Sequence, residues 1–434
     1  MKTRIDGGRL LDLVDGSLTA ASVLVDEESG RIAAIGDDLP SADRVVSLQG
    51  EVLLPGFIDV HVHLREPGFE DKETIASGAR AAAAGGFSQI LCMPNTKPPL
   101  DTPERITFVR RQAEAAGAAK VLPIGCITRG QAGRELTDFS ALQAAGAVAL
   151  SDDGHGVQHG GLMREALFQA ARLGLPVAIH AEDESLSAGG VLAPGAAHRL
   201  GLQGIPAAAE AAMIARDILL AEEAGAHLHV CHVSVESAVA LIRFAKQRGV
   251  RVTAEVTPHH LLLSDAVIDR DDAVYKVNPP LQSERDRQAC LAGFLDGTLD
   301  MVATDHAPHT ALEKAHPIAD APFGMVGIET VFPLLYTHLV LTGRMPLAEL
   351  VRRMSTAPAR AFGLRGGVLR VGAAADLVAV NLERERPIEP ERFHSKGRNT
   401  PFAGWLVRGW PALTLVDGRI VHADEEWVRV DTRG

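Results

Sequence analysis

The chain has 434 residues, which is long enough for one large barrel-type domain and a smaller second one. Its apolar fraction of 46%, charged fraction of 23% and net charge of −12, without any basic run, are typical of a globular protein and argue against nucleic acid as a partner. We find neither a signal-peptide core nor an apolar run of membrane-spanning length, and the four cysteines are widely spaced. We therefore expect a cytoplasmic protein with free thiols and no membrane partner.

The two ends of the chain share one pattern. Residues 1–55 contain short β-rich runs separated by turns, such as SVLVDEESGRIAAIG and RVVSLQGEVLLPG. The pattern returns after residue 362 in ADLVAVNL and WLVRGWPALTLVDGRIVHA. This arrangement predicts that residues 1–55 and 363–434 build one small β-sandwich-like domain beside residues 56–362.

The central part alternates β-rich and helical runs. Eight short β-rich runs lie between residue 57 and about residue 310, and glycine ends many of the Ala- and Leu-rich runs between them, as a helix C-cap does. This repeat predicts a (β/α)8 TIM-type barrel, with room for extra elements after the fifth and seventh strands. The predicted helices include 74–84, 103–116, 162–173, 207–224 and 235–248.

The first central strand ends in DVHVHLREPG. Because residues i and i+2 of a strand share a face, His61 and His63 are predicted to point with Asp59 into the barrel. Ile58, Val60, Val62 and Leu64 would then face the surrounding helices. Two neighbouring imidazoles at the carboxyl end of a barrel strand favour a shared cation, since active sites lie at that face. The alternative is a pair of separate, hydrogen-bonded core histidines.

Other strand ends also carry polar residues. Asp152 and Asp153 follow the fourth strand, His180 the fifth, His232 the sixth and Asp305 the eighth. Histidine and aspartate suit Zn²⁺ or a similar ion, and six candidate ligands are enough for two ions that share a carboxylate and a hydroxide.

Two details of these strand ends can be predicted by alternation. Only one of Asp152 and Asp153 can face the lumen, and Cys231, beside His232, should point away from it as a core thiol. No lysine occurs between Lys120 and Lys246, so a carbamylated lysine cannot bridge two metals at the fourth strand. An aspartate is the remaining bridge.

The motifs DVHVHLREPG, CMPNTKPPLD, SDDG, HAED, HVSV, TPHHL, VNPPL and ATDHAPH resemble those of the dihydroorotase family, bacterial class I type, in the amidohydrolase superfamily. The resemblance covers essentially the whole chain. It implies the reversible cyclisation of N-carbamoyl-L-aspartate to L-dihydroorotate in pyrimidine biosynthesis, by a metal-bridged hydroxide and an aspartate that acts as general base and acid.

The resemblance also implies roles for individual residues. His61, His63 and Asp305 would bind one Zn²⁺ ion, and His180 and His232 a second, with Asp153 as the bridge; one to two ions per subunit are implied, and two are favoured. Asp305 would also be the catalytic base. The substrate would be bound by His63, Arg65, Asn95, Asn278, His309, Phe323 and Gly324. An arginine fork pairs well with a carboxylate, although a surface salt bridge is the alternative use of Arg65.

The resemblance implies a homodimer and permits association with aspartate carbamoyltransferase. Residues 309–324, after the eighth strand, are expected to form a lid. Two other functions stay open. A related cyclic-amide hydrolase, such as an allantoinase or dihydropyrimidinase, would share the metals, and a non-catalytic partner of aspartate carbamoyltransferase would share the fold.

Overall fold

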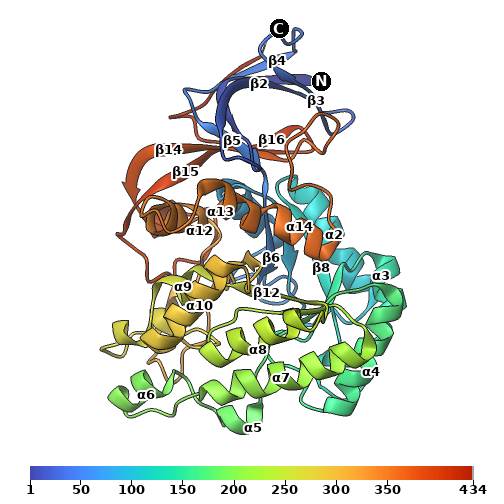
Figure 1. Cartoon of the computed structure of the whole chain (residues 1–434), viewed down its shortest axis with the longest axis vertical. Coiled ribbons are helices and arrows are strands. Elements are labelled where there is room, and N and C mark those ends of the chain that lie inside the picture. The colour runs from blue at the N-terminus through green and yellow to red at the C-terminus, as the bar shows by residue number, and fades with distance from the viewer. Residues whose placement is uncertain (433–434) are drawn as a thin grey trace.

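A barrel of eight parallel strands forms the centre of the protein, seen below the terminal sheet in Figure 1. The computed structural model describes residues 1–432. Strand order follows chain order, and a parallel bridge between Val62 and His306 joins the segment after the last strand to the first, so that the ring closes. The predicted (β/α)8 fold is confirmed. Its strands are β6 (Phe57–Val62), β7 (Phe87–Cys92), β8 (Lys120–Cys126), β9 (Ala149–Ser151), β10 (Val177–Ile179), β11 (Leu228–Val230), β12 (Val252–Val256) and β13 (Met301–Val302).

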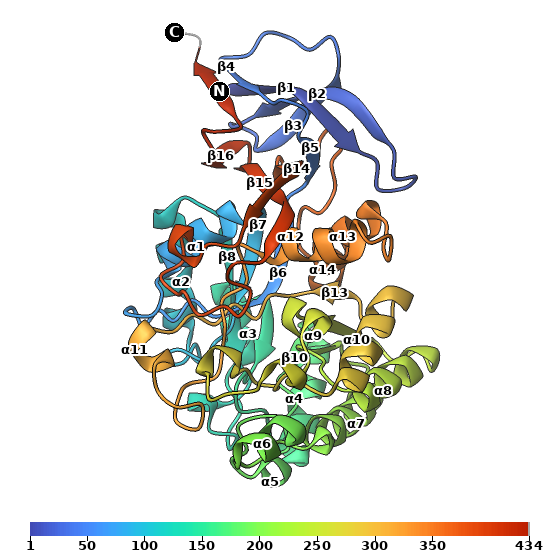
Figure 2. The same cartoon turned by 90° about the vertical axis from the view of Figure 1, so that its left-hand side faces the viewer.

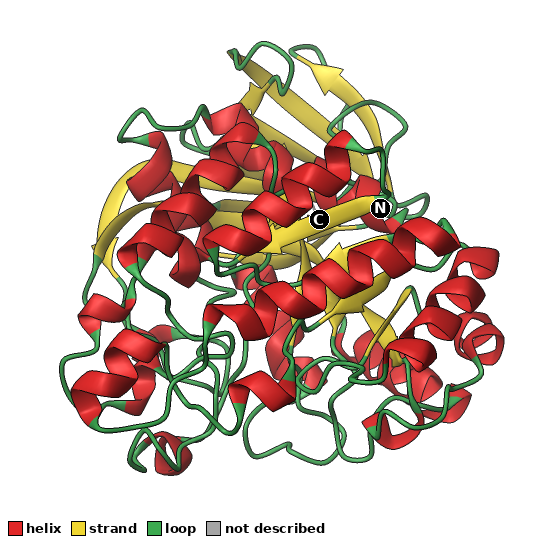
Figure 3. Cartoon of the chain, turned by 60° about the horizontal axis from the view of Figure 1, so that its bottom comes forward, coloured by secondary structure: helices red, strands yellow, loops and turns green. Residues whose placement is uncertain are grey.

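Helices surround these strands, as Figures 2 and 3 show from two further directions. Those that follow barrel strands are α1 (Ile75–Ala84), α2 (Pro103–Ala116), α3 (Phe139–Ala145), α4 (Gly160–Leu173), α7 (Ala207–Ala224), α8 (Glu236–Gln247), α10 (Glu284–Asp296), α12 (Val331–Leu335), α13 (Leu347–Met354) and α14 (Thr356–Phe362). All five predicted helices are present. The first begins one residue late because Thr74 is its N-cap, with a hydroxyl oxygen that accepts a hydrogen bond from the Ser77 amide at 3.1 Å.

Short helices occupy the longer connections. Two follow the fifth barrel strand and one follows the seventh, as predicted from the lengths of these segments; another begins the predicted lid. They are α5 (Glu184–Ser187), α6 (Pro194–Leu200), α9 (Pro258–Leu262) and α11 (Ala311–Lys314). No helix within residues 1–432 combines the length and the apolar character needed to cross a bilayer.

Both chain ends build one nine-stranded, mainly antiparallel sheet, as predicted, and both termini lie on it (Figure 1). Its strands are β1 (Lys2–Leu11), β2 (Leu18–Asp26), β3 (Arg31–Gly36), β4 (Arg44–Ser47), β5 (Val52–Pro55), β14 (Leu377–Pro387), β15 (Leu406–Val416), β16 (Arg419–Ala423) and β17 (Arg429–Thr432). The two ends meet where β5 pairs with residues 377–380 of β14 and where β4 pairs with β17. Because β5 ends at Pro55 and the first barrel strand, β6, begins at Phe57, the sheet lies next to the start of the barrel.

The barrel interior contains an apolar cluster of its own. Ile58 and Val60 pack there with Leu91, Ile124 and Met301, which come from other barrel strands, whereas Val62 and Leu64 belong to the core beneath the helices. The prediction that Ile58 and Val60 face the helices is therefore wrong. The register of β6 against β7 shifts between Asp59 and Val62, and this irregularity exchanges the two faces of the strand.

Candidate active site

The structure brings the six predicted metal ligands together at the carboxyl ends of β6, β9, β10, β11 and β13. All six side chains are buried: His61, His63, Asp153, His180, His232 and Asp305. Asp153 lies at the centre. Its Oδ1 is 3.5 Å from His61 Nε2 and 3.7 Å from both His180 Nδ1 and His232 Nε2, and its Oδ2 is 3.5 Å from His63 Nε2. One carboxylate thus faces all four imidazoles.

The second carboxylate lies beside the first two histidines. Asp305 Oδ1 is 3.0 Å from His63 Nε2 and 3.5 Å from His61 Nε2. Asp152, in contrast, points away from the cluster and accepts hydrogen bonds from the backbone of Ile127 and Thr128, at 2.8 and 3.0 Å. Of the two neighbouring aspartates, Asp153 therefore faces the lumen and Asp152 holds the loop that follows β8.

The residues in this cluster fit a divalent cation. His61 Nε2 and Asp153 Oδ1 are buried and have no hydrogen-bond partner among the described residues. Ligands held 2.0–2.1 Å from a tetrahedral ion lie roughly 3.3 Å apart, which is close to most of the separations here and longer than a hydrogen bond. Three overlapping groups could hold an ion: His61 with His63 and Asp305, His61 with Asp153 and His232, and His61 with Cys231 and Glu255.

The electrostatics of the cluster point the same way. Burial opposes ionisation of Asp153 and Asp305, yet the histidines, His61 foremost, hold the pKa of each carboxyl below its usual range. Burial likewise opposes a charge on His61, but Asp153, Glu255 and Asp305 raise its pKa well above its usual value. The cluster therefore favours added positive charge at Nε2 of His61, where a cation could replace a proton.

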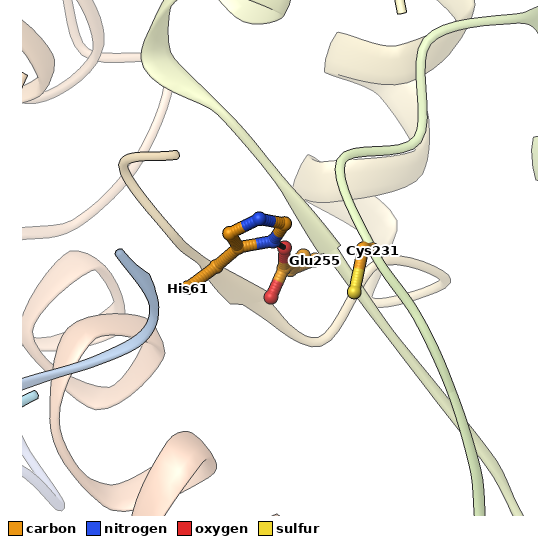
Figure 4. A group of neighbouring side chains, drawn as sticks. All are labelled: His61, Cys231 and Glu255. Carbon is orange, nitrogen blue, oxygen red and sulfur yellow. Dashed lines mark hydrogen bonds and ion pairs between the residues drawn. The ribbon is translucent and has the colours of Figure 1, made fainter. Parts of the chain in front are cut away.

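Backbone strain positions several of these groups. Arg65, His232 and Asp305 have positive φ values of 65°, 33° and 48°. Such values are costly for residues other than glycine and are often found at functional sites. At His232 the turn directs the ring toward Asp153 although the preceding residue, Cys231, also points inward; Figure 4 shows Cys231 beside His61 and Glu255. The prediction that Cys231 points away from the lumen is therefore wrong, because the strand ends before regular alternation reaches it.

A cavity of about 150 Å³ opens beside the cluster. Its lining includes six of the seven predicted substrate-binding residues: His63, Arg65, Asn95, Asn278, Phe323 and Gly324. Two larger hollows, of about 430 and 420 Å³, lie at the base of the barrel and beside α2, and within residues 1–432 neither contains a possible metal-binding group. We therefore take the smaller cavity as the candidate site.

Arg65 lies at the mouth of this cavity. Its Nε donates to the Pro308 carbonyl at 3.1 Å, and its Nη2 lies 3.0 Å from His309 Nε2. Burial lowers the pKa of Arg65 to about 10, against the attraction of Asp305, so the guanidinium stays charged at neutral pH. His309 Nε2 is also 2.7 Å from the Phe323 carbonyl, so this seventh residue supports the wall of the cavity.

Two amides fix the opposite sides of the cavity. Asn95 Oδ1 is 2.9 Å from His63 Nδ1. Asn278 Nδ2 donates to Glu182 Oε2 at 2.7 Å, and Glu182 Oε2 lies 3.2 Å from His180 Nε2. These contacts leave His63 Nε2 and His180 Nδ1 directed at the aspartates.

Sequence reasoning missed four residues that support the site: Glu182, His229, Glu255 and Asn399. Glu255 Oε1 lies 2.7 Å from His61 Nδ1 (Figure 4). The other oxygen of Glu255, Oε2, lies 2.8 Å from His229 Nε2. Asn399 comes from the segment before β15, accepts a hydrogen bond from the His309 amide and donates to the Ala307 and Gly324 carbonyls at 3.2 and 3.0 Å. Glu255 and His229 are polar residues inside the apolar strands VTAEV and LHV, and Glu182 lies in the motif HAED, so these three had a signal in the sequence. Asn399 had none.

Comparison with known proteins identifies the family. A family model described as dihydro-orotase-like matches residues 50–238, and one described as amidohydrolase family matches residues 296–422. Dihydroorotase from Bacillus caldolyticus is 53% identical over 410 residues, covering 94% of this chain and 96% of that protein. The chain belongs to the dihydroorotase family. A second dihydroorotase, from Halalkalibacterium halodurans, is 48% identical over 431 residues, with 99% of this chain and 100% of the relative covered.

Solved structures extend the likeness of this dihydroorotase-family chain to hydantoinases and dihydropyrimidinases. L-Hydantoinase (dihydropyrimidinase) from Arthrobacter aurescens has a TM-score of 0.85 at 28% identity, with 97% of this chain and 96% of that chain covered. Dihydropyrimidinase from Brevibacillus agri has a TM-score of 0.82 at 26% identity, with 98% and 96% covered. The neighbours thus share the barrel and the terminal sheet, while the much higher sequence identity lies with dihydroorotases.

Proposed function

We propose that this protein is a dihydroorotase, which interconverts N-carbamoyl-L-aspartate and L-dihydroorotate in pyrimidine biosynthesis. The observation that carries the proposal is one small cavity that joins a cluster able to hold a cation to the Arg65 guanidinium. Dihydroorotate has the matching parts, a cyclic amide and one carboxylate. The 53% identity to a dihydroorotase over nearly the whole chain supports the same substrate.

We assign the ions to two neighbouring sets of ligands. His61, His63 and Asp305 would hold one Zn²⁺, His180 and His232 a second, and Asp153 would bridge them. The separations from Asp153 to all four imidazoles support this bridge. A bound divalent ion lowers the pKa of water toward 7 and polarises a carbonyl, which supplies the nucleophile and the electrophile of amide hydrolysis at neutral pH.

Asp305 is the proposed proton carrier. In hydrolysis, its carboxylate would accept a proton from the attacking water and deliver it to the ring nitrogen as the carbon–nitrogen bond breaks. In ring closure the same proton would move in the opposite direction. Asp305 is buried at the cavity wall and its pKa is low, which supports its presence as the carboxylate that this role requires.

The substrate carboxylate would bind to Arg65 and Asn95. The Nε and Nη2 donors of Arg65 already contact protein atoms, whereas Nη1 has no hydrogen bond within residues 1–432, so part of the fork is free for a ligand. Asn278 and the backbone at Phe323 and Gly324 would contact the ring amide from the other wall, and His309 would hold that backbone in place. His63 would contribute to binding through its place between Asn95 and Asp305.

Further proposals concern assembly and location. We propose a homodimer, with association with aspartate carbamoyltransferase as a further partner, on the strength of the family resemblance; the mass in solution, alone and with that enzyme, tests both. We propose a cytoplasmic location, supported by four buried, free cysteines. Residues 309–324 are proposed to act as a lid, since they carry His309, Phe323 and Gly324 at the cavity.

A dihydropyrimidinase-type activity is the second candidate, because the structural neighbours include such enzymes. One assay separates the two. Hydrolysis of dihydroorotate, dihydrouracil and hydantoin is measured on protein of known metal content. We expect dihydroorotate to be strongly preferred, since only this substrate has a carboxylate for Arg65. Equal rates on dihydrouracil would favour the second candidate, and no turnover of any substrate by metal-loaded protein would favour a non-catalytic partner.

A further inference from the structure

A chain of polar side chains descends inside the barrel from the proposed metal ligand His61. Glu255 Oε1 lies 2.7 Å from His61 Nδ1 (Figure 4), and Glu255 Oε2 lies 2.8 Å from His229 Nε2. Thr253 Oγ1 lies 2.9 Å from His229 Nδ1 and 2.8 Å from His227 Nε2. Apart from the half-buried threonine, all of these side chains are buried. This series of hydrogen-bonded side chains ends at His227, which lines the hollow at the base of the barrel.

The hydrogen-bonding capacities of these groups determine which atom donates and which accepts at each contact of the series. A carboxylate only accepts, so Glu255 requires a proton on His61 Nδ1 and another on His229 Nε2. The lone pair of His61 is then on Nε2, the atom that faces Asp153 and Asp305. His229 Nδ1 accepts from the Thr253 hydroxyl, whose oxygen accepts from His227 Nε2. The neutral His227 ring then has no proton on Nδ1, which can only accept a hydrogen bond. This atom has no hydrogen-bond partner among the described residues.

Glu255 also touches a second proposed ligand. The backbone amide of His232, in its left-handed conformation, donates to Glu255 Oε1 at 3.2 Å. One carboxylate thus fixes the ring tautomer of His61 and the backbone that directs the ring of His232. Carboxylates that accept from ligating histidines orient those ligands and raise their basicity.

We propose that Glu255 and His229 are positioning residues of the metal centre: Glu255 sets the tautomer of His61 and the backbone of His232, and His229 holds Glu255. This inference rests on the proposed role of His61 as a metal ligand. A merely structural role would make the same side chains matter for stability alone. Metal affinity separates the two interpretations.

The experiment compares Co²⁺ binding to the metal-free full-length wild type and variants, by equilibrium dialysis and by the visible absorption of bound Co²⁺. Glu255→Gln keeps the size of the side chain but removes its negative charge, and the amide nitrogen cannot accept the hydrogen bond that one of the two carboxylate oxygens accepts in the wild type. We expect Co²⁺ affinity to fall about 10–100-fold with an altered spectrum, in protein whose circular dichroism stays native. The control is Glu210→Gln, another buried carboxylate, which accepts from the Ser234 amide at 3.0 Å and from none of the proposed ligands. It should bind Co²⁺ as the wild type does.

His229 provides a second, milder pair of variants. His229→Leu keeps an apolar group against Phe362, which packs on the ring at 5.0 Å, and removes the donor to Glu255. His229→Gln places an amide donor near the position of Nε2. We expect weaker Co²⁺ binding in the leucine variant and recovery in the glutamine variant. This pair decides the question if Glu255→Gln fails to fold.

Wild-type affinity and spectrum in folded Glu255→Gln, or equal affinities in the two His229 variants, would overturn the proposal. His61→Ala keeps that failure separate from a failure of the proposed function. If His61→Ala loses Co²⁺ while Glu255→Gln keeps it, the ligand assignment holds and the positioning role is wrong. If His61→Ala keeps full Co²⁺ binding, the ligand assignment itself is wrong.

Discussion

The barrel mouth and the terminal sheet differ in how many strained residues and how many buried polar side chains they contain. Six non-glycine residues within 1–432 have positive φ values; Arg65, His232 and Asp305 lie at the candidate site, whereas only Asp417 lies in the sheet, at the turn after β15. The mouth also buries four histidines against two aspartates. In β1 the buried Thr3 and Ile5 alternate with more exposed neighbours, as in an ordinary strand.

This difference shows where stability has been given up for function. A strained residue costs about 1–3 kcal/mol, and a buried charge without a partner costs more. Regular alternation over residues 2–6 of β1 avoids both costs there. Changes at the mouth should therefore affect cation binding and catalysis, whereas changes in the sheet should affect the free energy of unfolding.

The largest effect is expected when a ligand is lost. His232→Ala removes an imidazole that faces Asp153, so metal content and dihydroorotate hydrolysis should fall together, hydrolysis to background. Metal analysis and turnover on the same sample measure this, and a chelator should have the same effect on the wild type. Full metal stoichiometry in the folded variant would remove His232 from the ligand set.

A smaller effect is expected when only Asp305, the proposed proton carrier, is changed. Asp305→Asn keeps the shape and one coordinating oxygen but cannot accept a proton, so kcat should fall about 10²–10⁴-fold with metal retained. Steady-state kinetics with metal analysis give the answer. A near wild-type kcat at full metal content would rule out the proposed proton transfer by Asp305.

A binding defect should follow from Arg65→Lys. The ammonium is a point charge without a planar fork, and hydrogen bonds to charged groups contribute about 1.5–3 kcal/mol, so KM for dihydroorotate should rise roughly 10- to 100-fold with unchanged metal. Rates on dihydrouracil, which has no carboxylate, are the internal control. An unchanged KM for dihydroorotate would separate Arg65 from the substrate.

The smallest effect on activity is expected in the sheet, at His422 of β16. Burial, together with the nearby His394, lowers the pKa of His422 from 6.5 to about 4. The unfolded chain takes up this proton near pH 6.5 and the folded chain does not, so the contribution of the neutral ring is present above pH 6.5 and is lost as the pH falls toward 4. His422→Gln should flatten this part of the stability curve in urea titrations while leaving kcat and KM unchanged. An identical dependence of the unfolding free energy on pH in the variant and the wild type would contradict the lowered pKa of His422.

Local signals made much of the fold predictable. Proline at the start of α2 and glycine after its end marked residues 103–116, and glycine after α7 marked the end at residue 224. At the barrel mouth, the candidate metal ligands could be predicted because they are polar residues that follow the ends of strands. Alternation failed at Ile58, Val60 and Cys231, because the register shift in β6 and the left-handed turn at His232 depend on contacts between distant strands. Glu255 was missed for the same reason, since its partner His61 lies in another strand.

The pairing of β5 with β14 has a consequence for biosynthesis. Residues 52–55 leave the ribosome before any of the barrel, yet their partners at residues 377–380 emerge only after it. At roughly 5–20 residues per second, the N-terminal strands wait on the order of tens of seconds for this neighbour. A nascent chain therefore exposes β5 as an unpaired edge while the barrel forms beside it, and the Asn399 contacts that fix the cavity wall come later still. Translation speed and chaperone supply during that interval should determine how much active protein a cell obtains from each message.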